Sequence, residues 1–96
     1  MEVKELEIKT VVQPNRVTLL VDNRIVGFAT FPQIEENVVV INHTTVYPQY
    51  QGKGFASKIM EEVVKVLIEK EMKCRTSCSY AAGWFLKHPE YNYLLD

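Results

Sequence analysis

A short basic loop that contains two glycines leads into the longest helical pattern of the chain. Residues 51–56 read Gln-Gly-Lys-Gly-Phe-Ala and stand directly before an amphipathic run. The first turn of a helix leaves backbone N–H groups without intrahelical acceptors, and the helix dipole adds partial positive charge there. The glycines leave these groups open to a ligand, and Lys53 and Lys58 add full charges. The loop therefore predicts an anion site, with a phosphate or pyrophosphate as its natural occupant.

Two known phosphate-binding patterns do not fit this loop. A Walker A loop has wider glycine spacing and a Gly-Lys-Ser/Thr ending, which residues 52–57 lack. A dinucleotide-binding fingerprint follows the first strand of a parallel repeat, and the preceding strand begins no such repeat. From the loop alone, an ordinary strand-to-helix turn with incidental glycines is the alternative explanation.

Cys78 is the residue best placed for nucleophilic chemistry. It ends a predicted strand and immediately precedes a predicted helix. A thiol at a helix N-terminus is biased towards thiolate, which is the nucleophilic form. The alternative is a small apolar side chain where the sheet meets the helix. Cys74 has even spacing from Cys78 in the same strand, so it is expected in the core and too far away for a disulfide.

His43 is a candidate for moving a proton. It lies near the end of an apolar stretch, residues 37–47, which is predicted to be a central strand. An imidazole titrates near neutral pH, so it can take a proton from an ammonium acceptor or stabilise a thiolate on Cys78. A half-buried histidine that is hydrogen-bonded to the backbone is the structural alternative. His88, beside Pro89 at a helix end, is expected to be structural.

The hydrophobic pattern assigns the elements that position these residues. Strands are predicted over 4–12, 16–21, 24–31, 37–47 and 73–78, and helices over 54–72 and 79–87. The two-residue loop at Asp22 and Asn23 tolerates positive φ and predicts an antiparallel hairpin. Residues 32–37 are expected to be a polar connection. The order ββββ-α-β-α gives an α/β (α+β) fold class, a mostly antiparallel sheet followed by a helix-strand-helix unit.

Composition narrows the class of protein. The 96 residues, 47% of them hydrophobic and 24% charged, predict a single domain over residues 1–96. A net charge of −1 argues against nucleic-acid binding, and the short apolar runs argue against a membrane span. The first ten residues do not fit a signal or transit peptide. Two cysteines and two distant histidines have no recognised metal-ligand spacing, and this cysteine usage favours a reduced cytoplasmic protein.

In its context the loop resembles the acetyl-CoA-binding loop of the GNAT N-acetyltransferase superfamily. Residues 51–56 match that superfamily's Q/R-x-x-G-x-G/A pattern, whose amides hold the pyrophosphate of acetyl-CoA. The stretches INHTTVYPQYQGKG and SCSYAAGWFLKHPEY are similar to two signature blocks of the abbreviated GNAT-like proteins. The resemblance extends from Val21 onwards and implies a GNAT-like domain.

The resemblance implies acetyl-CoA as the cofactor and acetyl transfer to an amine, such as a protein or peptide lysine, as the activity. It implies that Cys78 is the active-site residue near the thioester. Transfer through an acetyl-Cys78 intermediate and direct attack by the amine both remain open. The residues expected to bind the cofactor are Thr45, Val46, Gln51, Gly52, Lys53, Gly54, Phe55, Ala56, Ser57 and Lys87.

Larger members of the superfamily have two helices before the hairpin that help to wall the acceptor pocket. This chain passes directly from its first strand to the hairpin, so the acceptor side is expected to be open. A CoA-binding sensor or interaction module without catalysis is the alternative function, because a fold can be kept while chemistry is lost. The partners expected are acetyl-CoA and an unidentified amine, without nucleic acid or membrane, for a monomer or weak dimer. Trp84, Phe85 and Tyr80 are expected in the core, with one of them as a candidate to flank the pantetheine arm.

Overall fold

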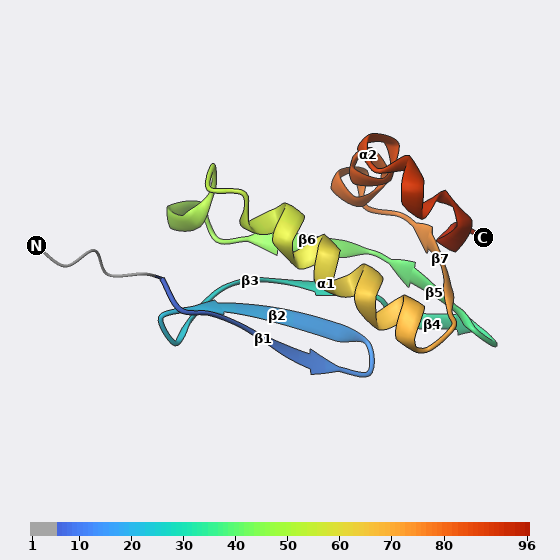
Figure 1. Ribbon diagram of the computed structural model, residues 1–96, viewed down its shortest axis with the longest axis horizontal. Helices are drawn as coiled ribbons and strands as arrows, with labels where there is room; N and C mark the ends of the chain where they lie inside the picture. Colours follow the sequence, from blue (N-terminus) through green and yellow to red (C-terminus); the bar gives the residue numbers. More distant parts are fainter. Residues whose placement is uncertain (1–5) are drawn as a thin grey trace, which may run out of the picture.

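The computed structural model describes residues 6–96 and contains two sheets and two α-helices (Figure 1). The four-stranded sheet has the order β1-β2-β3-β6 and consists of β1 (Ile8–Gln13), β2 (Arg16–Val21), β3 (Arg24–Thr30) and β6 (His43–Val46). The three-stranded sheet has the order β4-β5-β7 and consists of β4 (Gln33–Glu35), β5 (Val38–Ile41) and β7 (Lys73–Thr76). Among these seven strands, only β5 and β7 pair in parallel. The mostly antiparallel α/β arrangement predicted from the sequence is confirmed.

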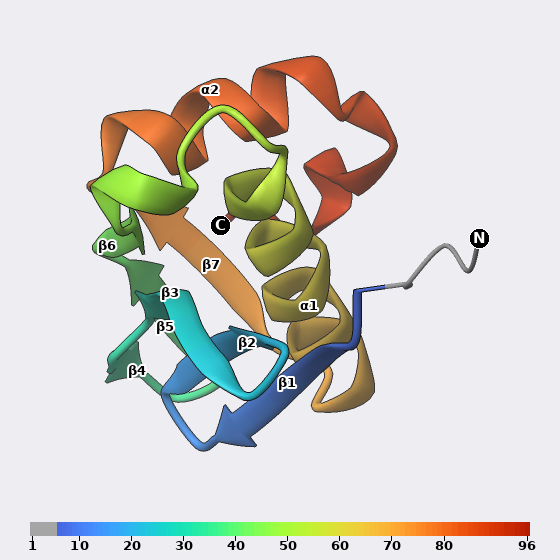
Figure 2. The same ribbon diagram turned by 90° about the vertical axis from the view of Figure 1, so that its left-hand side faces the viewer.

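Helix α1 (Phe55–Glu69) lies against one face of the four-stranded sheet and contacts β2, β3 and β6 (Figure 2). Its side chains Ile59, Val63 and Leu67 are fully buried, because they recur at helical spacing on one side. Helix α2 (Ser79–Lys87) contacts α1 and β7. The 3-10 segments η1 (Pro48–Tyr50) and η2 (Pro89–Leu94) precede α1 and follow α2.

The stretch 37–47 forms two strands, so the prediction of one strand was wrong. β5 and β6 belong to different sheets, and Asn42 lies between them. The Asn42 N–H donates to the Thr30 carbonyl at 3.2 Å, and the Asn42 side-chain oxygen accepts the Thr30 hydroxyl at 2.6 Å. An apolar run predicts extended backbone, but it does not show where a strand changes partner.

The other boundaries differ by a few residues. β4 lies within residues 32–37, which are predicted as a connection, because a strand of three residues is too short for alternation to show. Six strands therefore precede α1 instead of four. The first strand spans Ile8–Gln13 instead of 4–12, and residues 4 and 5 lie outside the described part. α1 ends at Glu69, and β7 ends at Thr76.

Two local predictions are confirmed by the backbone. The hairpin loop has φ of 50° at Asp22 and 65° at Asn23, the positive values that a two-residue turn requires. Helix α2 begins and ends where its pattern predicts. Both features depend on neighbours in sequence, which is why local patterns were sufficient.

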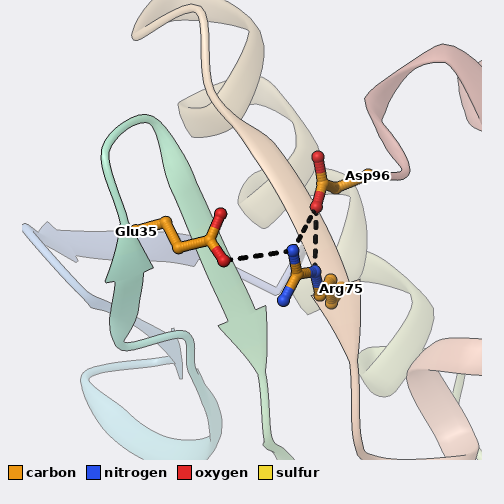
Figure 3. A network of polar contacts seen from close by, with 3 residues as sticks. All are labelled: Glu35, Arg75 and Asp96. Carbon is orange, nitrogen blue, oxygen red and sulfur yellow. Dashed lines mark hydrogen bonds and ion pairs between the residues drawn. The ribbon is translucent and has the colours of Figure 1, made fainter.

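The segment after η2 closes the outer edge of β7. Leu95 forms a parallel bridge to Cys74, and the Asp96 N–H donates to the Cys74 carbonyl at 2.9 Å. The Asp96 carboxylate also contacts the Arg75 guanidinium at 2.7 Å, and Glu35 on β4 reaches the same guanidinium at 3.3 Å (Figure 3). These exposed ion pairs are weak singly, but together they join β4, β7 and the final residues.

Candidate active site

The two sheets separate just after β5 and β7. The Ser77 N–H donates to the Ile41 carbonyl at 3.1 Å, and beyond this bond β6 pairs only with β3 among residues 6–96. Thr44 on β6 lies beside Cys78 after β7, and its N–H and hydroxyl help to lower the pKa of the Cys78 thiol. The edge of β6 that faces away from β3 therefore has free backbone groups beside the candidate nucleophile.

Gly27 on β3 allows β6 to come close, and the sequence analysis did not single it out. A Cβ at this position would collide with the Thr45 carbonyl oxygen and lie 3.0 Å from both Ile59 and Val46. A larger residue would push β6 away from α1 and distort this edge. An isolated glycine within a strand pattern indicates close approach of another backbone, so the signal was present in the sequence.

The loop before α1 has the backbone geometry of an anion cradle. Gly52 and Gly54 have φ of 79° and 82°, a left-handed conformation that favours glycine. A Cβ at either position would meet no atom within 4 Å, so the space beside the loop is open. The Lys58 N–H bonds to the Gly54 carbonyl at 3.2 Å, which leaves the preceding N–H groups of the first turn without helical acceptors. Gln51 ties the loop to β6 by donating from Nε2 to the Val46 carbonyl at 3.0 Å.

A groove of about 210 Å³ follows this loop towards α2. The residues that line it include Val46, Gln51, Gly52, Gly54, Phe55, Ala56 and Ser57, with Tyr50 and Tyr80. An adjoining hollow of about 360 Å³ shares Ser57 and Tyr80 and extends along α2 to Lys87 and His88. The structure thus brings most of the predicted cofactor residues to one groove.

Two predicted cofactor residues lie elsewhere. Lys53 lines a separate hollow of about 380 Å³ beside Arg24 and Tyr50. Thr45 pairs with Phe28 on β3, and strand alternation places its side chain on the sheet face opposite to α1. The Tyr47 N–H donates to the Val26 carbonyl, and because alternate residues along β6 bond to β3, the backbone groups of Thr45 also face β3 and not the free edge.

Cys78 has the electrostatic environment of a reactive thiol. It is the N-cap residue of α2, so the N–H groups of the first turn lie near its thiol even though none makes a capping hydrogen bond with it. Burial raises the pKa of Cys78, but the N–H groups of Ala81 and Tyr80 and the N–H and hydroxyl of Thr44 outweigh burial and hold the pKa below its usual value. By contrast, burial raises the pKa of Cys74 to about 11, and Cys74 is fully buried in the core as predicted.

His43 does not lie on the same side of β6 as Cys78. Thr44 points towards α1, where its hydroxyl is 3.6 Å from the Met60 sulfur. Because successive strand residues point to opposite faces, His43 lies on the uncovered face and is exposed. The structure does not bring the predicted base and the predicted nucleophile together.

Trp84 holds α2 against the first turn of α1. Its indole Nε1 donates to the Ser57 hydroxyl at 3.0 Å, and its ring stacks on His88 with centroids 3.9 Å apart. Trp84 and Phe85 are buried in the core as predicted, whereas Tyr80 is 40% exposed and lines the groove. The contact between Trp84 and Ser57 joins residues far apart in the chain, so no local sequence pattern predicts it.

Other kinds of site are not evident within residues 6–96. No group of three His, Cys, Asp or Glu side chains in that part of the chain is arranged to hold a metal ion. Neither of the α-helices in the described part is long and apolar enough to cross a membrane. The groove and Cys78 are therefore the features on which a functional interpretation depends.

The fold and this groove define an acyltransferase-like α/β protein, and the chain belongs to the GCN5-related N-acetyl-transferase family, whose model matches residues 16–94. It is similar to a GCN5-like protein of Staphylococcus aureus solved by NMR, with 26% identity and a TM-score of 0.72 over 98% of this chain and 91% of that one. A PaiA N-acetyltransferase of Thermoplasma acidophilum in complex with coenzyme A is 19% identical, with a TM-score of 0.62 over 76% of this chain and 48% of that one, and shows the fold alone.

Two curated proteins are also related in sequence. Protein NATD1 of Gallus gallus and of Mus musculus are each 23% identical to this chain over 64 residues. The match covers 67% of this chain and 58% of each relative, so it spans little more than half of their length.

Proposed function

We propose that this protein transfers an acetyl group from acetyl-CoA to an amine. The observation that carries the proposal is the position of Tyr80. Its side chain lines the groove that begins at the glycine loop, and its backbone N–H helps to lower the pKa of the Cys78 thiol. The anion cradle and the reactive thiol therefore belong to one site.

The groove fits the chemical groups of acetyl-CoA. The free N–H groups at the start of α1 suit a pyrophosphate, and the left-handed glycines leave room for its oxygens. The Ser57 oxygen accepts the Trp84 N–H, so the Ser57 proton can be donated to a phosphate. The free edge of β6, to which Thr44 and Val46 direct their backbone groups, suits the amides of the pantetheine arm. Lys87 in the adjoining hollow suits a further phosphate.

Cys78 is the nucleophile that we assign to the reaction. Its thiolate attacks the acetyl carbonyl carbon, a new C–S bond forms, and the bond to the CoA sulfur breaks to release CoA as a thiolate. The neutral amine then attacks the acetyl carbonyl carbon on Cys78, and a C–N bond forms. The bond to the Cys78 sulfur breaks to regenerate the thiolate, and the proton that the nitrogen loses passes to solvent. Exchange between two thioesters is nearly isoenergetic, so the covalent route divides one difficult step into two. Direct attack by the amine is the competing route.

The acceptor is proposed to approach from the uncovered sheet face. Within residues 6–96 no helix packs against the face opposite to α1 (Figure 2). Such a face leaves room for an amine carried on a peptide or protein. An ammonium acceptor with a pKa of about 10.4 must lose a proton before attack. His43, which the sequence predicts as the base, lies on this face and not beside Cys78, so it is not assigned to this step. The free thiol that this chemistry needs favours the reduced cytoplasm.

Calorimetric titration tests the cofactor part of this proposal. Acetyl-CoA and CoA are expected to bind with a stoichiometry of one per chain, and inorganic sulfate at equal concentration is expected not to displace them. The reason is that the groove offers the β6 edge as well as an anion cradle. Equal binding of sulfate, ATP and CoA would instead indicate a general anion site.

A further inference from the structure

The outer edge of β1 differs from the other sheet edges of the described part. The edge of β7 is closed by Leu95 and Asp96, and β4 is only three residues long. The free edge of β6 lies beside the groove that is proposed to bind acetyl-CoA. By contrast, β1 has six residues and pairs with β2 on one side, and no strand within residues 6–96 pairs with its other side.

β1 has few of the features that protect an edge strand from pairing. It contains no proline, and its register with β2 has no bulge. Its one charged side chain, Lys9, is neutralised by Glu7 at 3.0 Å. The apolar side chains Ile8, Val11 and Val12 are 45%, 48% and 49% exposed. A regular apolar edge of this kind is a template for another strand.

Only alternate residues of β1 direct their backbone groups outwards. The Asp22 N–H donates to the Glu7 carbonyl at 2.8 Å, which makes these opposite residues a hydrogen-bonded pair. Hydrogen-bonded and non-hydrogen-bonded pairs alternate along an antiparallel ladder. In the register of β1 with β2, the non-hydrogen-bonded positions are therefore Ile8, Thr10 and Val12. Their N–H and C=O groups point away from β2.

We propose that β1 pairs antiparallel with β1 of a second copy of this chain, about a two-fold axis at Thr10. In this register Thr10 lies opposite the partner's Thr10, and Ile8 lies opposite the partner's Val12. Every outward N–H and C=O group of the strand then has a partner. The side chains of Ile8 and Val12 are on the α1 side of the sheet, so they form an apolar strip across the interface.

Charge and backbone chemistry select this register over its two neighbours. With the axis at Thr10, Lys9 lies opposite the partner's Val11, and Glu7 lies opposite the partner's Gln13, so no like charges face each other. An axis at Lys9 would place two ammonium groups directly opposite. An axis at Val11 would place Ile8 opposite the partner's Pro14, which has no N–H to donate. Like charges in opposite positions destabilise a strand pair. The geometry thus predicts one symmetric, sheet-extending dimer.

This interface is independent of the proposed acetyl transfer. β1 and β6 are at opposite ends of the four-stranded sheet, so pairing at β1 leaves the groove beside β6 open. The monomer and the dimer are expected to bind CoA with equal affinity. A chain that dimerises but does not bind CoA would refute the proposed function and leave the dimer in place.

Analytical ultracentrifugation of the full chain tests the dimer. A small interface of this kind is expected to be weak. As the protein concentration is raised from about 1 µM to about 1 mM, the mass is therefore expected to rise from 11.1 kDa towards twice that value. Thr10→Pro removes the outward N–H on the axis without removing a bond to β2, and Thr10→Lys places two cations across the axis. Both variants are expected to raise the dissociation constant of the dimer at least about tenfold, because each disrupts the Thr10 pair at the centre of the interface.

A matched variant separates added charge from loss of the edge. Ile25→Lys adds the same charge at a strand residue that is 50% exposed but lies on β3, away from the edge, and it is expected to dimerise like the wild type. Circular dichroism and the CoA titration establish that each variant is folded. A wild-type mass of 11.1 kDa at every concentration would overturn the proposal. So would wild-type dimerisation by the folded Thr10→Pro or Thr10→Lys variant.

Discussion

The indole N–H of Trp84 donates to the Ser57 hydroxyl at 3.0 Å and thereby connects α2 to the first turn of α1. Ser57 lines the groove, whereas Trp84 is only 4% exposed. The buried ring thus fixes the orientation of a hydroxyl at the point where the anion cradle begins. The site therefore depends on a contact between two helices as well as on the glycine loop.

Trp84→Phe tests the role of this contact, because it keeps an aromatic ring but removes the donor. We expect a loss of about 1 kcal/mol in unfolding free energy, measured with urea, as for one net hydrogen bond. We expect CoA to bind about fivefold more weakly, which corresponds to a similar free energy. Ser57→Ala is expected to weaken CoA binding as well. Unchanged CoA affinity in both folded variants would mean that the Ser57 hydroxyl does not reach the cofactor.

Gly54→Val tests the glycine loop. Valine is strained at the φ of 82° that this position adopts, and its branched side chain occupies the open space beside the first-turn N–H groups. We expect CoA binding to disappear in calorimetry while circular dichroism shows the native helix content. Undiminished affinity in the folded variant would be incompatible with a phosphate at this loop.

Lys53→Ala and Lys65→Ala form a matched pair that separates local from general charge effects. Lys53 lies in the loop, whereas Lys65 is exposed on the outer side of α1 and pairs with Glu62 at 3.3 Å. Lys53→Ala is expected to weaken CoA binding and to reduce its salt dependence, because a positive charge between the two loop glycines is lost. Lys65→Ala is expected to leave both properties unchanged. Equal effects of the two substitutions in calorimetry would mean that only net charge matters.

The two cysteines are expected to differ in their reaction with iodoacetamide. The lowered pKa of Cys78 gives more thiolate near neutral pH, so its alkylation should rise with pH and reach half its maximum below the usual range of cysteine. Cys74, buried and with a pKa of about 11, should stay unmodified in the folded protein. Peptide mapping by mass spectrometry gives both profiles. A Cys78 profile centred at or above that of free cysteine would contradict this assignment.

Cys74→Ala is expected to reduce stability by about 1 kcal/mol through a small core void, without loss of CoA binding. Folding raises the pKa of Cys74 from 9.0 to about 11, so the folded state favours the neutral thiol. The stabilisation from Cys74 is therefore complete below about pH 9 and is lost as the pH rises towards 11. Urea unfolding at several pH values should show a weaker alkaline decline in Cys74→Ala than in the wild type, and equal declines would contradict this account.

The parts of the fold that the sequence predicted well depend on short-range chemistry. The turn at Asp22 and Asn23, the bounds of α2 and the left-handed glycine loop each follow from residues within a few positions of one another. The position of Cys78 at a strand end before a helix was also readable, and its lowered pKa agrees with that position.

The remaining features depend on partners that are distant in sequence. The change of sheet at Asn42 is set by bonds to Thr30, which no periodicity reveals. A single extra residue at such a point reverses which side chains face the core. This reversal explains why Thr44, rather than the predicted His43, lies beside Cys78.

Turnover of acetyl-CoA in the presence of amines is the measurement that tests the central claim most directly. Release of the CoA thiol, followed together with the mass of a lysine-containing peptide and of a small polyamine, would show whether acetyl groups are transferred. The account predicts acetylation of the peptide by the wild type, with a higher kcat/KM than for the polyamine because the acceptor face is open. It also predicts that Cys78→Ala binds acetyl-CoA normally but loses most of its turnover. Wild-type protein that binds acetyl-CoA and yet releases no thiol with any amine would contradict the account and indicate a CoA-binding module without catalysis.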